Sequence, residues 1–257
     1  MAKLAVLILT YNEEKNIEAC IKSASMADEI LVVDSCSSDE TRAIAESLGA
    51  RVVVRPMPDG FAAQRNFALT QTNCEWVMFL DADERITPEL AVEIRDTVNK
   101  NEPYAFDILR LNHLFGKLMS YGGFRPDWSL RLYPRSVISW TGLVHEQAHV
   151  TCPKRRLKSP MKHFTYDDWN RYFDKFNRYT SIMARKMFEE GKRASLLEAL
   201  FRSIWGFFRV YVLQSGWRDG RLGFIFSVIH FHYTFVKYVK LDDLYRQRDD
   251  RQRSIRE

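Results

Sequence analysis

Cysteines are few in this sequence, and a leader-like segment is absent. The four cysteines among 257 residues have neither the paired spacing of a metal site nor the density of a disulfide framework. Such sparse use of cysteine is typical of proteins from a reducing compartment. Residues 1–4 (MAKL) lack the basic region, the long apolar core and the small-residue cleavage site of a secretory signal. We therefore expect a cytoplasmic protein.

Several nucleotide-binding motifs are also missing. No Gly-x-Gly-x-x-Gly follows a strand-like segment, and neither Gly-Lys-Ser nor Gly-Lys-Thr occurs. These absences argue against a dinucleotide-dependent dehydrogenase and against a P-loop phosphotransferase. No recognisable nucleic-acid-binding motif is present, so we expect no nucleic-acid partner. A nucleotide site in this chain has to use other residues.

The excess positive charge belongs to the last third of the chain. The formal net charge is +5. Residues 185–257 alone hold fifteen Lys or Arg against nine Asp or Glu, so the preceding part is close to neutral. A basic C-terminal region favours an acidic partner at that end, such as an anionic membrane surface or a phosphorylated lipid.

Strand-like and helix-like segments alternate through the first hundred residues. Four short apolar runs have the length and composition of buried strands. These runs are residues 4–9, 29–33, 51–55 and 76–80. Ser37 and Glu40 have the spacing of a capping box at the start of the helix between the second and third runs. The alternation predicts an α/β fold with a mainly parallel sheet flanked by helices.

An acidic stretch follows the fourth apolar run. Asp81 and Asp83 are two residues apart, so in an extended segment their carboxylates point the same way. Two such carboxylates suit one divalent cation, which prefers oxygen ligands, and a nucleotide diphosphate would be its second partner. The alternative is a solvated acidic turn before a helix that starts at Thr87 and Pro88.

Further polar residues lie at the ends of neighbouring predicted strands, where ligands bind in open α/β sheets. Thr10 and Glu13 follow the first run, and Asp34 ends the second, where it could hydrogen-bond a ribose or a base edge. Arg65 precedes the acidic stretch on a predicted helix, and its fork of donors suits a pyrophosphate. The structural alternatives are turn residues for the first three and a surface ion pair for Arg65.

Four of these segments, in this order and spacing, resemble family 2 glycosyltransferases of the GT-A fold. They are residues 6–13 (VLILTYNE), 30–41 (with ILVVDS and SDET), 65–66 (RN) and 79–84 (FLDADE). The resemblance covers roughly the first hundred residues and implies a Rossmann-like GT-A domain. It implies that Thr10, Glu13 and Asp34 hold the nucleoside of a UDP-sugar. It also implies that Arg65 approaches this donor.

The same resemblance implies a metal and a catalytic base. Asp81 and Asp83 would bind the diphosphate with its Mg²⁺ or Mn²⁺, and His163 would join the metal as the late histidine of the fold. Glu146 would take the proton from the acceptor hydroxyl in an inverting displacement at the anomeric carbon, with Asp127 as the second candidate for this base. The alternatives are an ion pair with an arginine for Glu146 and a packed or hydrogen-bonded ring for His163.

The character of the sequence changes near residue 165. We predict a GT-A catalytic domain over residues 1–165, with a nucleotide-sugar half (1–100) and an acceptor half (101–165). A helical, basic extension follows over residues 166–257. Within it the apolar run 222–236 is fifteen residues long, short of the roughly twenty that span a bilayer. We interpret it as an interfacial membrane anchor, with a dimer interface or a buried helical pair as the alternative.

The segment before this run has the pattern of an amphipathic helix. One side carries Leu197, Leu200, Phe201, Ile204, Phe208, Tyr211 and Val212. Glu198, Arg202 and Arg209 share the other side. We expect the basic residues to hold the apolar side against anionic lipid, which predicts peripheral attachment to the cytoplasmic face of the inner membrane. The oligomeric state is left open by the sequence.

Three later segments resemble a narrower group, the bacterial lipopolysaccharide core β-1,4-glucosyltransferases of the WaaE and LgtF type. These segments are residues 143–146 (LVHE), 163–166 (HFTY) and 216–224 (GWRDGRLGF). The resemblance implies transfer of a sugar, with glucose expected, from a UDP-sugar to the inner-core heptose of a lipid-linked oligosaccharide acceptor. The alternatives are a transferase that acts on polyprenyl phosphate or another cell-surface glycan, and a non-catalytic scaffold with the same fold.

Overall fold

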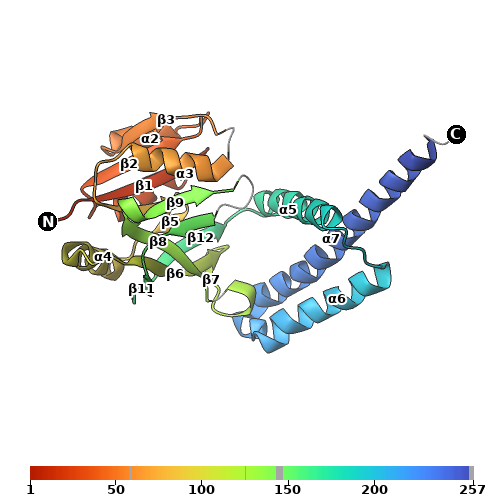
Figure 1. The fold of residues 1–257 in the computed structure, drawn as a ribbon. Coiled ribbons are helices and arrows are strands. Elements are labelled where there is room, and N and C mark those ends of the chain that lie inside the picture. Colours follow the sequence, from red (N-terminus) through yellow and green to blue (C-terminus); the bar gives the residue numbers. More distant parts are fainter. Residues whose placement is uncertain (58–59, 125, 143–146, 255–257) are drawn as a thin grey trace. The chain divides into compact units, whose positions relative to one another are not determined.

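The computed structural model describes residues 1–57, 60–124, 126–142 and 147–254 (Figure 1). The chain forms two compact units. The first, called the sheet unit here, consists of Met1–Leu111 and Pro126–Thr165. The second, called the helical unit, consists of Asn112–Arg125 and Tyr166–Glu257.

Four parallel strands form the first half of the sheet. They are β1 (Leu4–Thr10), β2 (Glu29–Asp34), β3 (Arg51–Val54) and β4 (Trp76–Asp81). β1 lies between β2 and β4, and β2 pairs with β3, all in parallel register. The order β3-β2-β1-β4 places a topological switch point between β1 and β4, where ligands bind in open α/β sheets. The predicted α/β class is confirmed.

Four helices accompany these strands. They are α1 (Ile17–Ser23), α2 (Thr41–Ser47), α3 (Gly60–Thr70) and α4 (Pro88–Lys100). α4 begins as the sequence predicts, because Thr87 Oγ1 accepts a hydrogen bond from Leu90 N at 3.2 Å and Pro88 occupies the first turn. Asn101, in the left-handed conformation, ends this helix.

The rest of the sheet follows the order β4-β8-β6-β12-β5. β8 runs antiparallel to both β4 and β6, and β12 runs antiparallel to β5. β9 and β10 form a separate antiparallel pair, joined in sequence to β8 by the 3₁₀ turn Arg135–Val137. The bounds are β5 (Glu84–Arg85), β6 (Ala105–Leu114), β8 (Trp128–Pro134), β9 (Ile138–Thr141), β10 (Gln147–Val150), β11 (Lys154–Arg156) and β12 (Met161–Tyr166).

The core of the sheet unit covers both faces of the parallel strands. Along β1, Leu4, Val6 and Ile8 belong to one apolar cluster, whereas Ala5 and Leu7 belong to the other. Successive side chains of a strand point to opposite faces, so a strand that is covered by helices on both sides needs apolar residues at every position. This is why the apolar run is continuous, and it leaves the polar residues for the strand ends.

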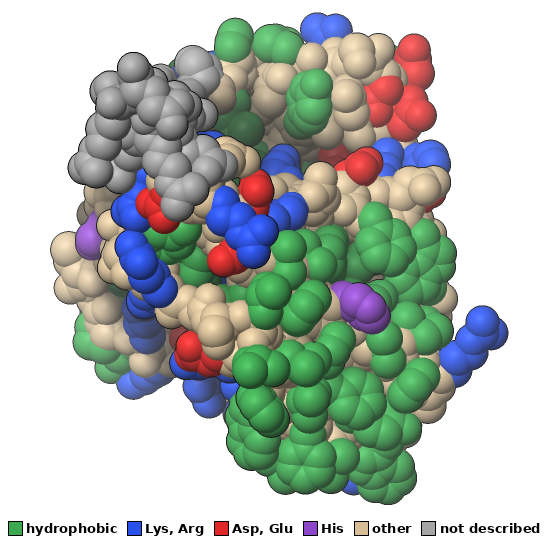
Figure 2. Space-filling view, turned by 90° about the vertical axis from the view of Figure 1, so that its right-hand side faces the viewer, with side chains coloured by type: hydrophobic (Ala, Val, Ile, Leu, Met, Phe, Trp, Pro, Cys, Tyr) green, Lys and Arg blue, Asp and Glu red, His purple; other side chains and the backbone are tan. Residues whose placement is uncertain are grey.

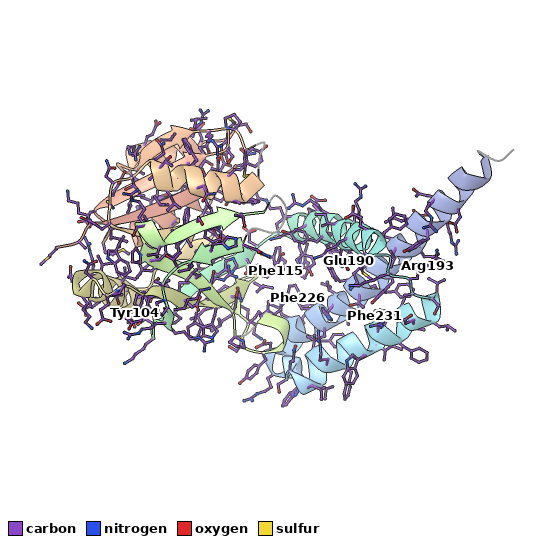
Figure 3. All side chains as sticks on the ribbon, viewed as in Figure 1. Tyr104, Phe115, Glu190, Arg193, Phe226 and Phe231 are labelled. Atoms are coloured by element: carbon purple, nitrogen blue, oxygen red, sulfur yellow. The ribbon has the colours of Figure 1, made fainter. Side chains whose placement is uncertain are left out.

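The helical unit consists mainly of three long helices. They are α5 (Trp169–Glu189), α6 (Leu196–Phe208) and α7 (Gly220–Ser254). A π-helical turn (Arg209–Leu213) and a 3₁₀ turn (Gly216–Asp219) connect α6 to α7. The aromatic rings of Phe115, Trp169 and Phe226 stack on one another, with Phe115 and Trp169 centroids 4.0 Å apart. Figure 3 labels Phe115 and Phe226.

The segment Asn112–Arg125, which includes β7 (Lys117–Leu118) and a 3₁₀ turn (Gly122–Phe124), belongs to the helical unit. The sequence placed it in the acceptor half of the catalytic domain instead. Its backbone explains the difference: Ser120 N and Tyr121 N donate to the buried Asp219 carboxylate at 3.1 and 2.9 Å. These two backbone amides and Asp219 are about one hundred residues apart, so the local sequence pattern could not predict their contact.

The residues around Asp219 form a tightly packed turn. Gly216 is buried, and a Cβ added there would lie 2.7 Å from the carbonyl oxygen of Val210. A Cβ added at Gly223 would overlap the carbonyl oxygen of Gly216. Gly216 and Gly223 of the segment GWRDGRLGF are therefore required by close backbone packing, and Gly220 by its positive φ of 62°.

α7 is longer than the apolar run 222–236 suggested. Of the described helices, α7 with the turn before it (Gly216–Asp249) is long and apolar enough to cross a membrane by length and composition, and 17% of its apolar window is buried. The apolar run 222–236 is thus part of a longer helix that meets the length and composition of a membrane span, and peripheral attachment stays a prediction.

α6 turns its small residues inward and its large apolar residues outward. Ala199, Ser203 and Gly206 are buried, and a Cβ at Gly206 would lie 3.2 Å from His230 of α7. The exposed apolar face, which Figure 2 shows as a broad group of hydrophobic side chains, continues from α6 to the start of α7. It consists of Leu196, Leu197, Leu200, Phe201, Ile204, Trp205, Phe208, Val212, Leu213, Trp217 and Phe224.

Candidate active site

Thr10 and Asp34 meet at the carboxyl ends of β1 and β2, where they are register partners. Asp34 is fully buried, and its carboxylate accepts hydrogen bonds from Thr10 Oγ1 at 3.1 Å and from Ser37 N at 2.8 Å. Ser37 Oγ donates to the same carboxylate at 2.5 Å. The two predicted residues therefore lie together, and Asp34 also fixes the turn that follows β2.

Glu13 lies in the loop after β1, beside this turn. Its backbone N donates to Thr41 Oγ1, and Asn12 N donates to Ser37 Oγ, both at 2.8 Å. The Glu13 carboxylate accepts from Asn16 Nδ2 at 2.8 Å. Ser37 does not cap α2 as predicted, since Glu40 is the N-cap residue and makes no side-chain cap. The loop after β1 and the loop after β2 are thus connected by hydrogen bonds to Ser37 and Thr41. The sequence pattern had suggested only a helix-capping role for Ser37.

Arg65 lies on α3, where aromatic rings from β4 and β9 hold its side chain. Only 5% of it is exposed, and its guanidinium carbon lies 4.8 Å from the ring centres of both Phe79 and Trp140. The next residue, Asn66, connects α3 to β9. Its side chain exchanges hydrogen bonds of 2.7 and 2.9 Å with the backbone of Trp140. Stacking of this kind fixes the plane of the guanidinium and leaves its edge directed to a carboxylate.

That carboxylate is Asp81, at the end of β4. Arg65 Nη2 lies 3.4 Å from Asp81 Oδ1, and Arg131 Nη2 donates to Asp81 Oδ2. The Asp81 side chain is 36% exposed, whereas that of Arg131 is 4% exposed. A ligand can therefore reach Asp81 from solvent while both arginines support it from within the protein.

Glu84 is the buried counterpart of Asp81. It accepts from Arg131 Nη2 at 2.5 Å, from Arg110 Nη1 at 3.3 Å and from the backbone N of Asp81 at 3.0 Å, with its side chain fully buried. Arg110 Nη2 also donates to Asp127 Oδ1 at 2.9 Å. Strands β4, β5, β6 and β8, with Asp127 just before β8, thus supply one continuous charge cluster, in which three carboxylates alternate with arginines.

The charges in this cluster shift its acids in opposite directions. Desolvation disfavours ionisation of Asp81, but the charges of Arg131 and Arg65 outweigh it and hold the pKa of Asp81 well below its ordinary value. Burial raises the pKa of Glu84, and the nearby Asp81 charge adds to this effect while Arg131 opposes it. Burial favours loss of the Arg131 proton, yet Asp81 and Glu84 raise the pKa of Arg131 and keep it charged.

Asp83 and His163 meet beside this cluster. His163 Nε2 lies 3.3 Å from Asp83 Oδ2, and Phe164 N donates to the backbone oxygen of Asp83 at 2.8 Å. The pairing of β5 with β12 brings the two together, since His163 is the register partner of Glu84. Among the described residues, no group of three or more His, Cys, Asp or Glu side chains is placed to hold a metal ion. Asp81 instead faces the two arginines.

The two candidates for the base have different positions. Asp127 precedes β8 and is paired with Arg110. Glu146 lies outside the residues that the structure describes. The geometry therefore describes the surroundings of Asp127 alone.

Sequence reasoning missed the charged residues of the strands. Arg131 is flanked by Leu130 and Leu132 on β8, and Arg110 by Leu109 and Leu111 on β6. An arginine at a strand position between leucines has to be paired when it is buried. That pattern could have identified both residues, although it would not have shown their carboxylate partners.

Replacing Arg131 with Met should destabilise the fold strongly. The buried Glu84 would lose its closest cation, and removal of one member of a buried ion pair costs about 3–5 kcal/mol. Urea unfolding would measure this loss. Arg155→Met is a matched control, since its pair with Glu102 is half exposed and should contribute at most about 1 kcal/mol. Equal stability of the two variants would contradict a structural role for Arg131.

Comparison with known proteins by sequence identifies relatives of this chain. Residues 5–113 match the family model described as glycosyl transferase family 2. A glycosyltransferase of Rickettsia bellii (strain RML369-C) is 30% identical, with 94% of this chain and 87% of that protein covered. The lipopolysaccharide core biosynthesis glycosyltransferase LpsC of Rhizobium meliloti (strain 1021) is 28% identical, with 93% and 91% covered.

A solved structure of glucosyl-3-phosphoglycerate synthase from Mycobacterium tuberculosis, in complex with Mn²⁺, UDP and glucosyl-3-phosphoglycerate, is also similar. Its TM-score is 0.42 at 21% identity, with 53% of this chain and 58% of that chain covered. The sequence matches alone, one of which extends over almost the whole of both chains, are sufficient to identify the family. The chain belongs to glycosyltransferase family 2, and its mainly parallel sheet with flanking helices is the GT-A fold of that family.

Proposed function

We propose that this protein is an inverting glycosyltransferase that moves a sugar, expected to be glucose, from a UDP-sugar to the inner-core heptose of lipopolysaccharide. The observation that carries this proposal is the convergence of Arg65 and Arg131 on the exposed Asp81 at the end of β4. The two buried guanidinium groups keep the exposed Asp81 ionised at this strand end, where a diphosphate and its cation can bind. The likeness to LpsC over more than nine tenths of both chains supports the lipopolysaccharide core as the acceptor.

In this proposal different strand ends bind different parts of the UDP-sugar. Thr10 and Asp34, the last residues of β1 and β2, and Glu13, in the loop after β1, hold the nucleoside. Arg65, kept in place by its aromatic neighbours, stabilises the negative charge that builds on the departing UDP. Arg131 supports Asp81 from the buried side. The sheet therefore positions these groups before the donor binds.

The residues present also fit a divalent metal. Asp83 supplies carboxylate oxygens, and His163 supplies an imidazole nitrogen 3.3 Å away, a donor set that Mg²⁺ or Mn²⁺ accepts in combination with phosphate oxygens. Asp81 would be the third protein ligand. When bound, the metal supplies charge neutralisation at the diphosphate. Asp83, in the turn between β4 and β5, and His163, on β12, contribute by holding their donor atoms close together.

Glu146 is the proposed base, and Asp127 is the reserve. A base for an inverting displacement needs a carboxylate that can accept the proton of the acceptor hydroxyl. Asp127 is engaged by Arg110 at 2.9 Å, so it is suited to positioning the charge cluster. Glu146 follows β9 in sequence, in the segment LVHE that resembles the narrower family.

A donor assay tests the proposed function directly. Purified protein is incubated with a panel of UDP-sugars and a heptose-containing core acceptor, and UDP release is measured with and without Mg²⁺ or Mn²⁺. We expect turnover with UDP-glucose that depends on both the acceptor and the metal. Release of UDP from none of these donors, under conditions in which the protein is folded, would refute the proposal.

A second candidate is transfer of the sugar to polyprenyl phosphate. The observation in its favour is α7, which has the length and composition to cross a membrane. Product analysis with both acceptors distinguishes the two candidates. Sugar on the lipid phosphate, with none on core oligosaccharide, would replace the first candidate by the second.

The proposed function includes attachment to an anionic membrane surface through the exposed apolar face. α6 packs on α7 through Ala199, Ser203 and Gly206 and turns its Leu, Phe and Trp side chains outward. Small residues at the helix interface and large apolar residues outside are typical of helices in contact with lipid. Arg202, Arg209, Arg218 and Arg221, which lie along the same segment, complement anionic headgroups.

Replacing Leu197, Phe201 and Trp205 together with Ser should lower binding to anionic vesicles by at least about tenfold, or roughly 1.4 kcal/mol. The three side chains are 69%, 68% and 57% exposed, so their loss should not unfold the protein. Vesicle flotation measures the binding. Replacing Val54, Phe61 and Val92 together with Ser is the matched control, because these three apolar side chains are also exposed, on the sheet unit.

The basic residues give an independent test. Replacing Arg202, Arg209, Arg218 and Arg221 with Gln should remove the preference for anionic over neutral vesicles, since each cation near the surface contributes on the order of 1 kcal/mol. Alkaline carbonate should release the wild-type protein from membranes. Retention in carbonate would show that α7 spans the bilayer, and equal binding to both kinds of vesicle before and after replacement would exclude the lipid role.

A further inference from the structure

A basic pocket of about 530 Å³ lies within the helical unit. Residues from the end of α5, the turn after it, the first turns of α6 and the middle of α7 line it. Figure 3 labels two of them, Glu190 and Arg193, at the end of α5 and in the following turn. The volume is within the range of small-molecule sites, about 300–1,000 Å³. No residue assigned to sugar transfer contributes to this pocket.

Positive charge in the pocket exceeds negative charge. Five lining side chains are Lys or Arg and two are Glu. Glu198 pairs with Arg202 at 2.7 Å, and Glu190 pairs with Lys192 at 2.6 Å. The three other cations, Lys186, Arg193 and Lys237, make no ion pair with the part of the chain that the structure describes. Both carboxylates of the pocket are therefore paired with other cations, and three cations without an ion pair to any described residue line the same cavity.

Lys237 is the one of these three cations whose charged form is disfavoured by its surroundings. Burial lowers the pKa of its ammonium group, and the positive charges of Arg202 and Lys192 lower it further. Its nearest aromatic partner is Tyr238, with 5.1 Å from Nζ to the ring centre. A half-buried cation among other cations is unfavourable unless an anion joins it. An anionic ligand would supply the missing negative charge.

We propose that this pocket binds a phosphoryl group through Lys186, Arg193 and Lys237. A phosphomonoester has close to two negative charges near neutral pH and several strong acceptor oxygens, which matches three cations that line one pocket. The pocket is larger than a phosphate ion, and Met183, Met187 and Tyr238 give it apolar walls. These walls suit the carbon part of a phosphorylated molecule, either a lipid with a phosphate headgroup or a soluble phosphomonoester.

Titration of the full-length protein with glycerol 3-phosphate at an ionic strength of about 0.15 M, where exposed charges are screened, tests the inference, with binding followed by calorimetry. Replacing Lys186, Arg193 and Lys237 together with Gln should weaken binding at least about tenfold. The control variant replaces Arg171, Arg178 and Arg185 with Gln, which removes the same charge from exposed positions of α5 outside the pocket. The control should bind within about twofold of wild type, because screened surface charges contribute little.

Equal affinities of the pocket variant and the control variant would overturn the proposal, and so would the absence of saturable binding by wild-type protein. Lys186 and Arg193 are exposed, so the single variants Lys186→Gln and Arg193→Gln keep the test valid if the triple variant does not fold. Each single variant should weaken binding severalfold. No UDP-sugar is present in this titration, so its outcome is independent of the proposed transfer reaction.

Competition identifies the source of the phosphoryl group. Vesicles that contain phosphatidic acid present a phosphomonoester on a lipid, whereas glycerol 3-phosphate presents it in solution. A lipid ligand predicts that phosphatidic acid vesicles displace glycerol 3-phosphate from wild-type protein more strongly than phosphatidylglycerol vesicles of equal surface charge. A soluble ligand predicts that neither kind of vesicle displaces it.

Discussion

Replacing Asp83 with Ala should lower the rate of sugar transfer by at least about a hundredfold, the loss that removal of one electrostatic group at a reacting centre can cause. Asp83 follows β4, its side chain is 32% exposed and its Oδ2 lies 3.3 Å from His163 Nε2. Its removal therefore takes away stabilisation of the departing diphosphate without opening a cavity in the core. The initial rate of UDP release, measured over a range of Mg²⁺ and Mn²⁺ concentrations, gives the effect.

Asp96→Ala is the matched control for this variant. Asp96 is an exposed aspartate on α4, so the substitution removes the same charge from the sheet unit away from the strand ends. Its rate should equal that of wild type, and both variants should unfold at the same urea concentration as wild type. Full activity of Asp83→Ala, or full activity of the wild-type protein in the presence of a chelator, would exclude the metal role of Asp83.

The parallel half of the sheet was predictable from the sequence because its strands are buried on both faces. The predicted runs 4–9 and 76–80 differ from β1 and β4 by one residue at the carboxyl end. That residue is polar in both strands, Thr10 in one and Asp81 in the other. The continuous apolar pattern ends where the sheet ends, so the strand and the beginning of the candidate site are marked by the same change in composition.

The arrangement inside the site was less predictable. Asp81 and Asp83 were expected to turn the same way and share a cation, but Asp81 contacts Arg65 and Arg131 while Asp83 contacts His163. β8 and β12, which carry Arg131 and His163, reach these residues through pairings between segments far apart in sequence. Local spacing contains no information on such pairings, so the division of the two acids could only come from the structure.

The helical unit shows the same limit in another form. The three-and-four pattern of α6 correctly indicated an amphipathic helix, yet it could not show which side packs. In a soluble protein the large apolar side would be expected inside. In the structure the small residues Ala199, Ser203 and Gly206 are inside, because they allow close approach to α7. Periodicity therefore defines a face, and the partner of that face has to be established separately.

Replacing Glu146 with Gln should lower sugar transfer by about a hundredfold or more while leaving UDP-sugar affinity nearly unchanged. Glutamine keeps the size and most of the hydrogen bonding of glutamate but cannot accept the proton of the acceptor hydroxyl. A direct binding measurement with UDP-glucose and a rate measurement with the core acceptor separate the two quantities. A base acts only in the chemical step, so the loss should fall on kcat.

Asp127→Asn distinguishes the two candidates for this base. Asp127 accepts a hydrogen bond from Arg110, which also contacts the buried Glu84. Its replacement should disturb this charge cluster and lower stability by about 1 kcal/mol, the contribution of a partly exposed pair, with a smaller loss of kcat than Glu146→Gln. Normal transfer by Glu146→Gln together with a hundredfold loss of transfer in Asp127→Asn would assign the base to Asp127. Replacement of the true proton acceptor lowers the rate of transfer and leaves the affinity for the donor unchanged.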